Sequence, residues 1–173
     1  SGLQSDAPLP QYIVATGGTI TCSGDYKIHT FTGPGTFTVC SVGNPFGSDE
    51  VSYMVVAAGG GAGGYTGGGG AGGFRESKAS SDCYSASPLN ATCGPGFNLP
   101  VSAQGYPITV GGGGAASTTN AGQGTDGGNS IFSTITSTGG GGSAGDTAPT
   151  RDGRSGGSGG ANTGGGGAGS NNC

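Results

Sequence analysis

The first forty residues alternate short runs of β-branched and aromatic residues with glycine and proline. Such runs cover 19–22, 26–32 and 36–40, and Gly33-Pro34-Gly35 separates the last two. This pattern is typical of short strands joined by turns. We therefore predict a small antiparallel β unit within residues 17–50.

Residues 1–16 stand apart from this pattern. They hold two prolines and one short apolar patch, Tyr12-Ile13-Val14. The stretch is predicted to be an extended N-terminal arm, of the kind that adds a strand to a neighbouring molecule.

From residue 51 onward, short apolar strands lead into runs of glycine. The predicted strands are 51–58, 106–110 and 130–136, and a fourth glycine tract near the C-terminus has no obvious strand before it. No window places apolar residues at i, i+3, i+4 and i+7, and glycine disfavours a helix by ~1 kcal/mol per residue. We expect essentially no α-helix, and we interpret residues 51–173 as one module of strands and glycine segments.

Glycine recurs with a period of three in residues 60–74. Read in triplets, the first two positions are glycine and the third carries a side chain, apart from the triplet that begins with Thr66. A polyproline-II-type helix has three residues per turn and no internal hydrogen bonds, so two of its edges would be bare backbone here. Ordering each residue costs ~1–2 kcal/mol, so such a helix must bond to neighbours. We predict an array of polyglycine-II helices; the alternative is a flexible glycine/serine linker.

The composition indicates a fold that depends little on side-chain burial. Glycine supplies 45 of the 173 residues, whereas Leu, Ile, Val and Phe together supply 24, below the roughly 20% that a conventional core needs. The predicted fold class is mainly β with polyglycine-II helices, in which short antiparallel strands lead into packed glycine segments. Five basic against nine acidic residues do not form the basic surface that nucleic acid requires. No apolar run approaches the ~18 residues of a membrane span, so no membrane insertion is expected.

Three motifs resemble the recurrent glycine-rich module of bacteriophage tail-fibre and tail-tip proteins. They read VSYMVVAAGGGAGG, YPITVGGGG and SIFSTITSTGGGG, and the resemblance covers about residues 17–145. It implies glycine-helix sandwiches that form a rigid tip, with loops 75–104 and 115–129 contacting a cell-surface receptor or glycan. Under this resemblance the receptor-contact candidates are the aromatic residues Phe74, Tyr84, Phe97 and Tyr106.

The chain has five cysteines, Cys22, Cys40, Cys83, Cys93 and Cys173. They form no CxxC pair and the single His29 adds little toward a zinc site, so no metal is expected. In an oxidising compartment the shortest disulfides would join Cys22 to Cys40 and Cys83 to Cys93, with Cys173 free or bonded to another subunit. The alternative is that all five are reduced. Within the second loop, Asn90 begins an Asn-Ala-Thr glycosylation sequon.

No motif supports catalysis or a cofactor. Gly59, Gly61 and Gly64 match a dinucleotide-binding spacing, but the residues that follow cannot form the helix that this site requires. His29 would be the only histidine base, and it lies in a predicted strand. The adjacent acids Asp49-Glu50 point to opposite faces of an extended chain. We therefore expect neither enzyme activity nor a cofactor.

The sequence favours a homo-oligomeric structural and attachment protein, extracellular or on a virion surface, of the phage tail-fibre or tail-tip type. One alternative is a cellular extracellular filament, in which the arm 1–16 adds a strand to the next subunit and Asn90 carries a glycan. Another is an ice-binding protein, although Tyr65 and Phe74 on the glycine frame argue against the flat face that it would need.

Overall fold

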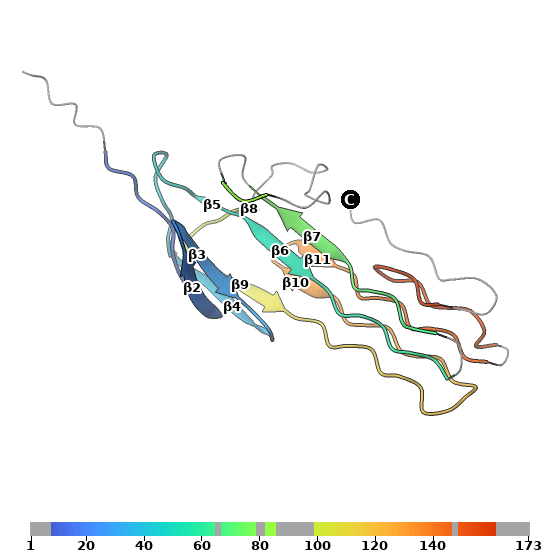
Figure 1. Ribbon diagram of the computed structural model, residues 1–173. Helices are drawn as coiled ribbons and strands as arrows, with labels where there is room; N and C mark the ends of the chain where they lie inside the picture. The colour runs from blue at the N-terminus through green and yellow to red at the C-terminus, as the bar shows by residue number, and fades with distance from the viewer. Residues whose placement is uncertain (1–7, 65–66, 79–81, 86–98, 147–148, 162–173) are drawn as a thin grey trace, which may run out of the picture.

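The computed structural model describes residues 8–64, 67–78, 82–85, 99–146 and 149–161 (Figure 1). Within these ranges the chain forms short strands and no helix, which confirms the predicted mainly β fold. Accordingly, this part of the chain offers no helix that could cross a membrane. The strands are β1 (Val14–Thr16), β2 (Thr19–Ser23), β3 (Tyr26–Thr30), β4 (Gly35–Ser41), β5 (Glu50–Val51), β6 (Tyr53–Val56), β7 (Phe74–Ser77), β8 (Leu99–Pro100), β9 (Gly105–Thr109), β10 (Ser130–Phe132) and β11 (Ile135–Ser137).

The largest sheet joins N-terminal strands to strands that carry glycine segments. Its order is β1-β4-β9-β10-β11, and every neighbouring pair is antiparallel. The remaining strands form the two-stranded sheets β2–β3, β5–β8 and β6–β7. Because β4 pairs with β9, strands from both the predicted β unit and the predicted glycine-rich module share one sheet.

A small core lies between the five-stranded sheet and β6, which contacts β10 and β11. Successive side chains of a strand point to opposite faces. In β6, Val55 is accordingly buried, whereas Met54 and Val56 are 66% and 50% exposed. The buried cluster consists of Ala15, Phe37, Val39, Val55, Val101, Tyr106 and Phe132.

The strand predicted over 130–136 is wrong in one respect, because the chain turns within it. β10 and β11 form a hairpin around Ser133 and Thr134, and Ser133 has a φ of 55°. A non-glycine residue rarely adopts this left-handed conformation, and favoured two-residue hairpin turns use Asn, Asp or Gly. No sequence signal therefore marks the turn.

The described part of the N-terminal arm leads away from the sheets at the end opposite the glycine segments (Figure 1). The Asn44 side chain holds it, since Oδ1 accepts from Gln11 N–H at 3.0 Å and Nδ2 donates to Leu9 O at 2.8 Å. Leu9 and Tyr12 are 82% and 66% exposed. The last three residues of the predicted arm form β1 and pair with β4 of the same chain.

Candidate functional site: the glycine array

Five extended segments adjoin the strands and run beside one another (Figure 1); they are residues 57–64, 67–73, 111–117, 122–129 and 138–145. Residues 153–161 lie beside them and turn back on themselves, since Gly160 N–H donates to Arg154 O at 2.9 Å. We call all of these residues the glycine array. The candidate site is this array, because it contains most of the backbone hydrogen bonds that lie outside the strand pairs of the described residues.

Array segments continue the register of the strand pairs that lead into them. Val56 lies opposite Phe74 in the β6–β7 pair, and further along Gly60 N–H donates to Gly70 O at 2.9 Å in the same register. The β9–β10 and β10–β11 registers also continue, through bonds from Gly128 to Gly112, Thr125 to Ala115, Gly127 to Gly140 and Gly124 to Ser143. The sheets therefore determine which glycine residues face one another.

Segment 57–64 follows β6, and segment 122–129 precedes β10 of the five-stranded sheet. Hydrogen bonds between these two segments recur at every third residue. Segment 57–64 donates to segment 122–129 through the pairs Ala58 to Gly128, Gly61 to Thr125 and Gly64 to Gly122. Stacked sheets normally stand ≈ 10 Å apart because side chains separate them. Here the backbones of two layers bond directly. A repeat of three is that of a polyproline-II-type helix, so the bond spacing agrees with the triplet frame, while the helical geometry itself stays a prediction.

The segment 139–145 occupies the centre of the array, and we call it the central segment. All seven of its residues are buried. Each of their N–H groups donates a hydrogen bond, as buried backbone groups must to avoid a desolvation penalty. The acceptors, in order from Gly139 to Gly145, are Asn129 Oδ1, Ala58 O, Ser158 O, Asp126 Oδ1, Gly61 O, Ala161 O and Thr150 O.

Backbone bonds connect the central segment to five neighbouring stretches, which are 57–64, 67–73, 122–129, 153–157 and 158–161. These stretches surround the central segment, and each one bonds to the next in the order 122–129, 57–64, 67–73, 158–161 and 153–157. The circle is open between 122–129 and 153–157, where no backbone bond joins the two among the described residues.

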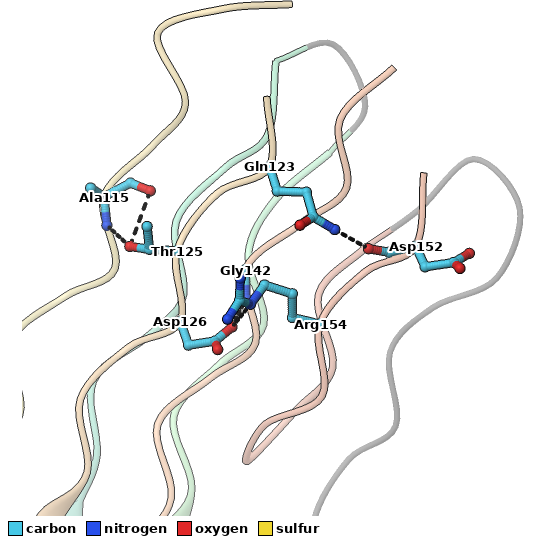
Figure 2. A network of polar contacts seen from close by, with 7 residues as sticks. All are labelled: Ala115, Gln123, Thr125, Asp126, Gly142, Asp152 and Arg154. Atoms are coloured by element: carbon cyan, nitrogen blue, oxygen red, sulfur yellow. Dashed lines mark hydrogen bonds and ion pairs between the residues drawn. The ribbon is translucent and has the colours of Figure 1, made fainter. Parts of the chain in front are cut away.

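Side chains fill this open side of the central segment. Asp126 Oδ1 accepts from Gly142 N–H at 2.9 Å (Figure 2). Asn129 Oδ1 accepts from Gly139 N–H at 2.9 Å. The two side chains are three residues apart, as are the two N–H groups that they bind. They therefore take the place of two carbonyls of a sixth segment.

Arg154 completes this polar network, since its Nε lies 2.8 Å from Asp126 Oδ1 (Figure 2). Burial alone would raise the pKa of Asp126, but the hydrogen bonds from Gly142 N–H and Arg154, together with the Arg154 charge, lower it below its ordinary value. Nearby, Gln123 Nε2 donates to Asp152 O at 2.8 Å. The network ties 122–129 to 153–157 where backbone bonds do not.

Sequence reasoning missed this network. Arg154 pairs with Asp126, which lies far earlier in the chain, and no local pattern links the two residues. One signal was available: polar side chains recur every third residue in the stretch Gln123-Gly-Thr-Asp126-Gly-Gly-Asn129.

Bare backbone is required at most positions of the array. A Cβ added at Gly60 would lie 2.2 Å from Gly141 O, and one added at Gly63 would lie 1.7 Å from Ala144 O. Such distances are far inside van der Waals contact. By contrast, Ala62 and Ala71, which carry side chains in the triplet frame, are exposed. The triplet frame thus separates packed positions from open ones.

The four predicted contact residues do not form one surface. The prediction that Tyr106 is available for receptor contact is wrong, because Tyr106 lies in the core and only 7% of it is exposed. Its ring lies 6.3 Å from that of Phe132, and its hydroxyl accepts from Ser102 N–H at 2.8 Å. Phe74 is half-buried in β7. Phe97 lies outside the described residues.

Tyr84 is 42% exposed, but its own chain engages the ring. Lys78 Nζ lies 5.4 Å from the ring centroid, and the Tyr26 ring meets it edge-on at 6.1 Å. Burial and the Asp82 carboxylate raise the pKa of the Tyr84 hydroxyl, partly offset by a hydrogen bond with Ser52. These contacts anchor the 82–85 stretch to the β2–β3 hairpin, so Tyr84 is not a free stacking platform.

The expected disulfide between Cys22 and Cys40 is absent, because both thiols are free and exposed. Cys22 belongs to the β2–β3 hairpin opposite Lys27, whereas Cys40 points outward from β4 in another sheet. Cys83 is also free. Cys93, Cys173 and the sequon residue Asn90 lie outside the described residues.

The residues considered for catalysis make contacts that belong to the fold. His29 Nδ1 lies 2.8 Å from Gly17 O, and its ring meets Phe37 edge-on at 5.1 Å. Gly59, Gly61 and Gly64 belong to the array rather than to a loop before a helix. In the described ranges, no group of three or more His, Cys, Asp or Glu residues could hold a metal ion.

The chain matches the glycine-rich domain family over residues 30–173. This match includes every segment of the array. No curated protein and no solved structure is significantly similar to the chain.

Proposed function

We propose a non-enzymatic structural role for this chain, which belongs to the glycine-rich domain family. In this proposal it forms the rigid part of an extracellular fibre, of the phage tail-fibre or tail-tip type, and its loops contact a cell-surface receptor or glycan. Polyglycine-II packing would supply the rigidity.

The central segment is the observation that carries this proposal. Its seven buried N–H groups are all bonded, and the partners come from stretches spread between Ala58 and Ala161. Moving one segment would break bonds to several others, and each buried group left unpaired costs ~1–3 kcal/mol. A rod built in this way resists bending and local opening, which suits a load-bearing element rather than a catalytic one.

Electron microscopy of the purified native protein tests the structural role. We expect fibres, or rod-like tips that decorate cells bearing the receptor. Amide hydrogen exchange provides the matching test of rigidity: residues 139–145 should exchange only with global unfolding, whereas the exposed β2–β3 hairpin should exchange faster. Free exchange along 139–145, as in an unstructured linker, together with isolated monomers in micrographs would contradict the proposal.

A cellular extracellular filament is the second candidate, because the arm carries exposed apolar side chains. Leu9 and Tyr12 extend from the body with 82% and 66% exposure, as a strand-exchanging arm would. Removing residues 1–12 tests this role without disturbing Ile13, which packs against the core, or β1. Filaments should then separate into subunits, whereas a closed tip oligomer should survive the deletion.

A further inference from the structure

One face of the glycine array keeps unpaired backbone groups. It is formed by segments 57–64 and 111–117, which adjoin through a bond from Gly114 N–H to Gly59 O at 2.9 Å. We call it the open face. Among the described residues, the groups without a hydrogen-bond partner include the N–H groups of Gly59, Ala62, Gly113 and Ala116 and the C=O groups of Gly111 and Gly114.

These groups lie in rows with the three-residue spacing of the array. Gly59 and Ala62 supply donors on one segment, and Gly111 and Gly114 supply acceptors on the adjoining one. The open face therefore presents the donor and acceptor spacing that joins segments inside the array.

The face is open because the strand beside β9 does not continue along it. β4 starts at Gly35, opposite Ile108, so β4 does not extend beside segment 111–117. An unpaired edge of this kind is a template for another chain.

No feature of the open face blocks such pairing. Neither segment contains a charged residue or a proline, the devices with which native edges usually prevent association. The opposite side of the array differs, because Asp126 and Asn129 satisfy the N–H groups there and Arg154 adds charge. The chain thus closes one side with its own side chains and leaves the other side free.

We propose that the open face is a docking surface for a second copy of this chain. A face that carries both a donor row and an acceptor row is self-complementary about a two-fold axis, so donors of one copy meet acceptors of the other. Approach is unhindered at Gly112 and Gly113, where even an added Cβ would meet nothing within 4 Å. The inference rests on the proposed structural role and assigns one of its assembly contacts.

The contact is narrow compared with a standard protein interface, so the isolated pair should associate weakly. Additional contacts in a fibre would reinforce it through multivalency. Association should therefore depend strongly on protein concentration.

Sedimentation equilibrium of the full chain tests the docking surface with two matched variants. Gly113→Asp places a charge on the open face, and Gly68→Asp places one on segment 67–73; at neither position would a Cβ meet any atom within 4 Å. We expect the wild type to associate, Gly113→Asp to weaken association at least about tenfold because like charges face each other, and Gly68→Asp to behave as the wild type. A wild type that stays monomeric at its highest soluble concentration, or equal association of all three proteins, would overturn the proposal.

Micrographs of the same samples distinguish this inference from the proposed function. Assemblies that persist unchanged in Gly113→Asp contradict the docking surface alone. If the wild type forms no fibre or tip at all, the structural role is contradicted as well.

Discussion

Replacing Gly140 by alanine tests whether bare backbone is the packing surface of this protein. A Cβ at this position would lie 2.0 Å from Gly70 O and 2.6 Å from Gly70 C. Both are backbone atoms, so no side chain can rotate away. Segments 67–73 and 138–145 would have to separate by roughly 1.4 Å or more to restore van der Waals contact.

The expected loss follows from the bonds between these two segments. Gly70 N–H donates to Gly141 O at 2.7 Å, and Gly73 N–H donates to Thr138 O at 2.7 Å. Losing both in a buried site costs roughly 2–6 kcal/mol, and the lower chain entropy of unfolded alanine returns only ~0.4–1 kcal/mol. We expect a net loss of roughly 2–5 kcal/mol. For a protein of this size that lowers Tm by roughly 5–15 °C.

Gly112→Ala is the matched control, because it is also the second residue of a four-glycine run. Its added Cβ would meet nothing within 4 Å, so alanine should be neutral or stabilise by up to ~1 kcal/mol. Thermal unfolding followed by circular dichroism or calorimetry compares the two variants with the wild type. Equal Tm values for both variants would refute the packing argument.

Three further outcomes follow from polar contacts. Asp126→Ala should cost about 1–3 kcal/mol in urea unfolding because it leaves the Gly142 N–H unpaired, whereas Asp126→Asn keeps an acceptor and should cost under ~1 kcal/mol; equal losses would contradict the acceptor role. The pKa of Asp126 is lowered in the folded state, so its stabilisation is complete above its unfolded pKa of about 3.9 and disappears as pH falls through the lower folded value. In Tm measurements from about pH 5 to pH 2, Asp126→Asn should flatten part of this decline. Tyr106→Phe should cost ~1 kcal/mol, measured by the same urea unfolding, because Ser102 N–H loses its acceptor; no change would mean that water replaces the hydroxyl.

Sequence reasoning was most successful where one residue type has one physical consequence. Glycine and β-branched residues in short alternating runs predicted strands without helices, and the triplets in 60–74 predicted bare backbone at the glycine positions that pack. It failed where a residue's role depends on distant neighbours. Tyr106 looked available for contact, yet the rings of Phe37 and Phe132 enclose it.

The sequence by itself favoured backbone packed against backbone over a flexible linker, because side chains are too few to form a large core and an extended glycine segment cannot bond to itself. Only the tertiary structure decided that one four-glycine run lies inside and another lies at the surface. Residues 139–142 are buried at the centre, while Gly112 and Gly113 of the run 111–114 are exposed. The reason is strand pairing. Residues 139–142 follow β11 and lie between five stretches that bond to them. Residues 111–114 follow β9 beyond the start of β4, so no strand lies beside them on that edge.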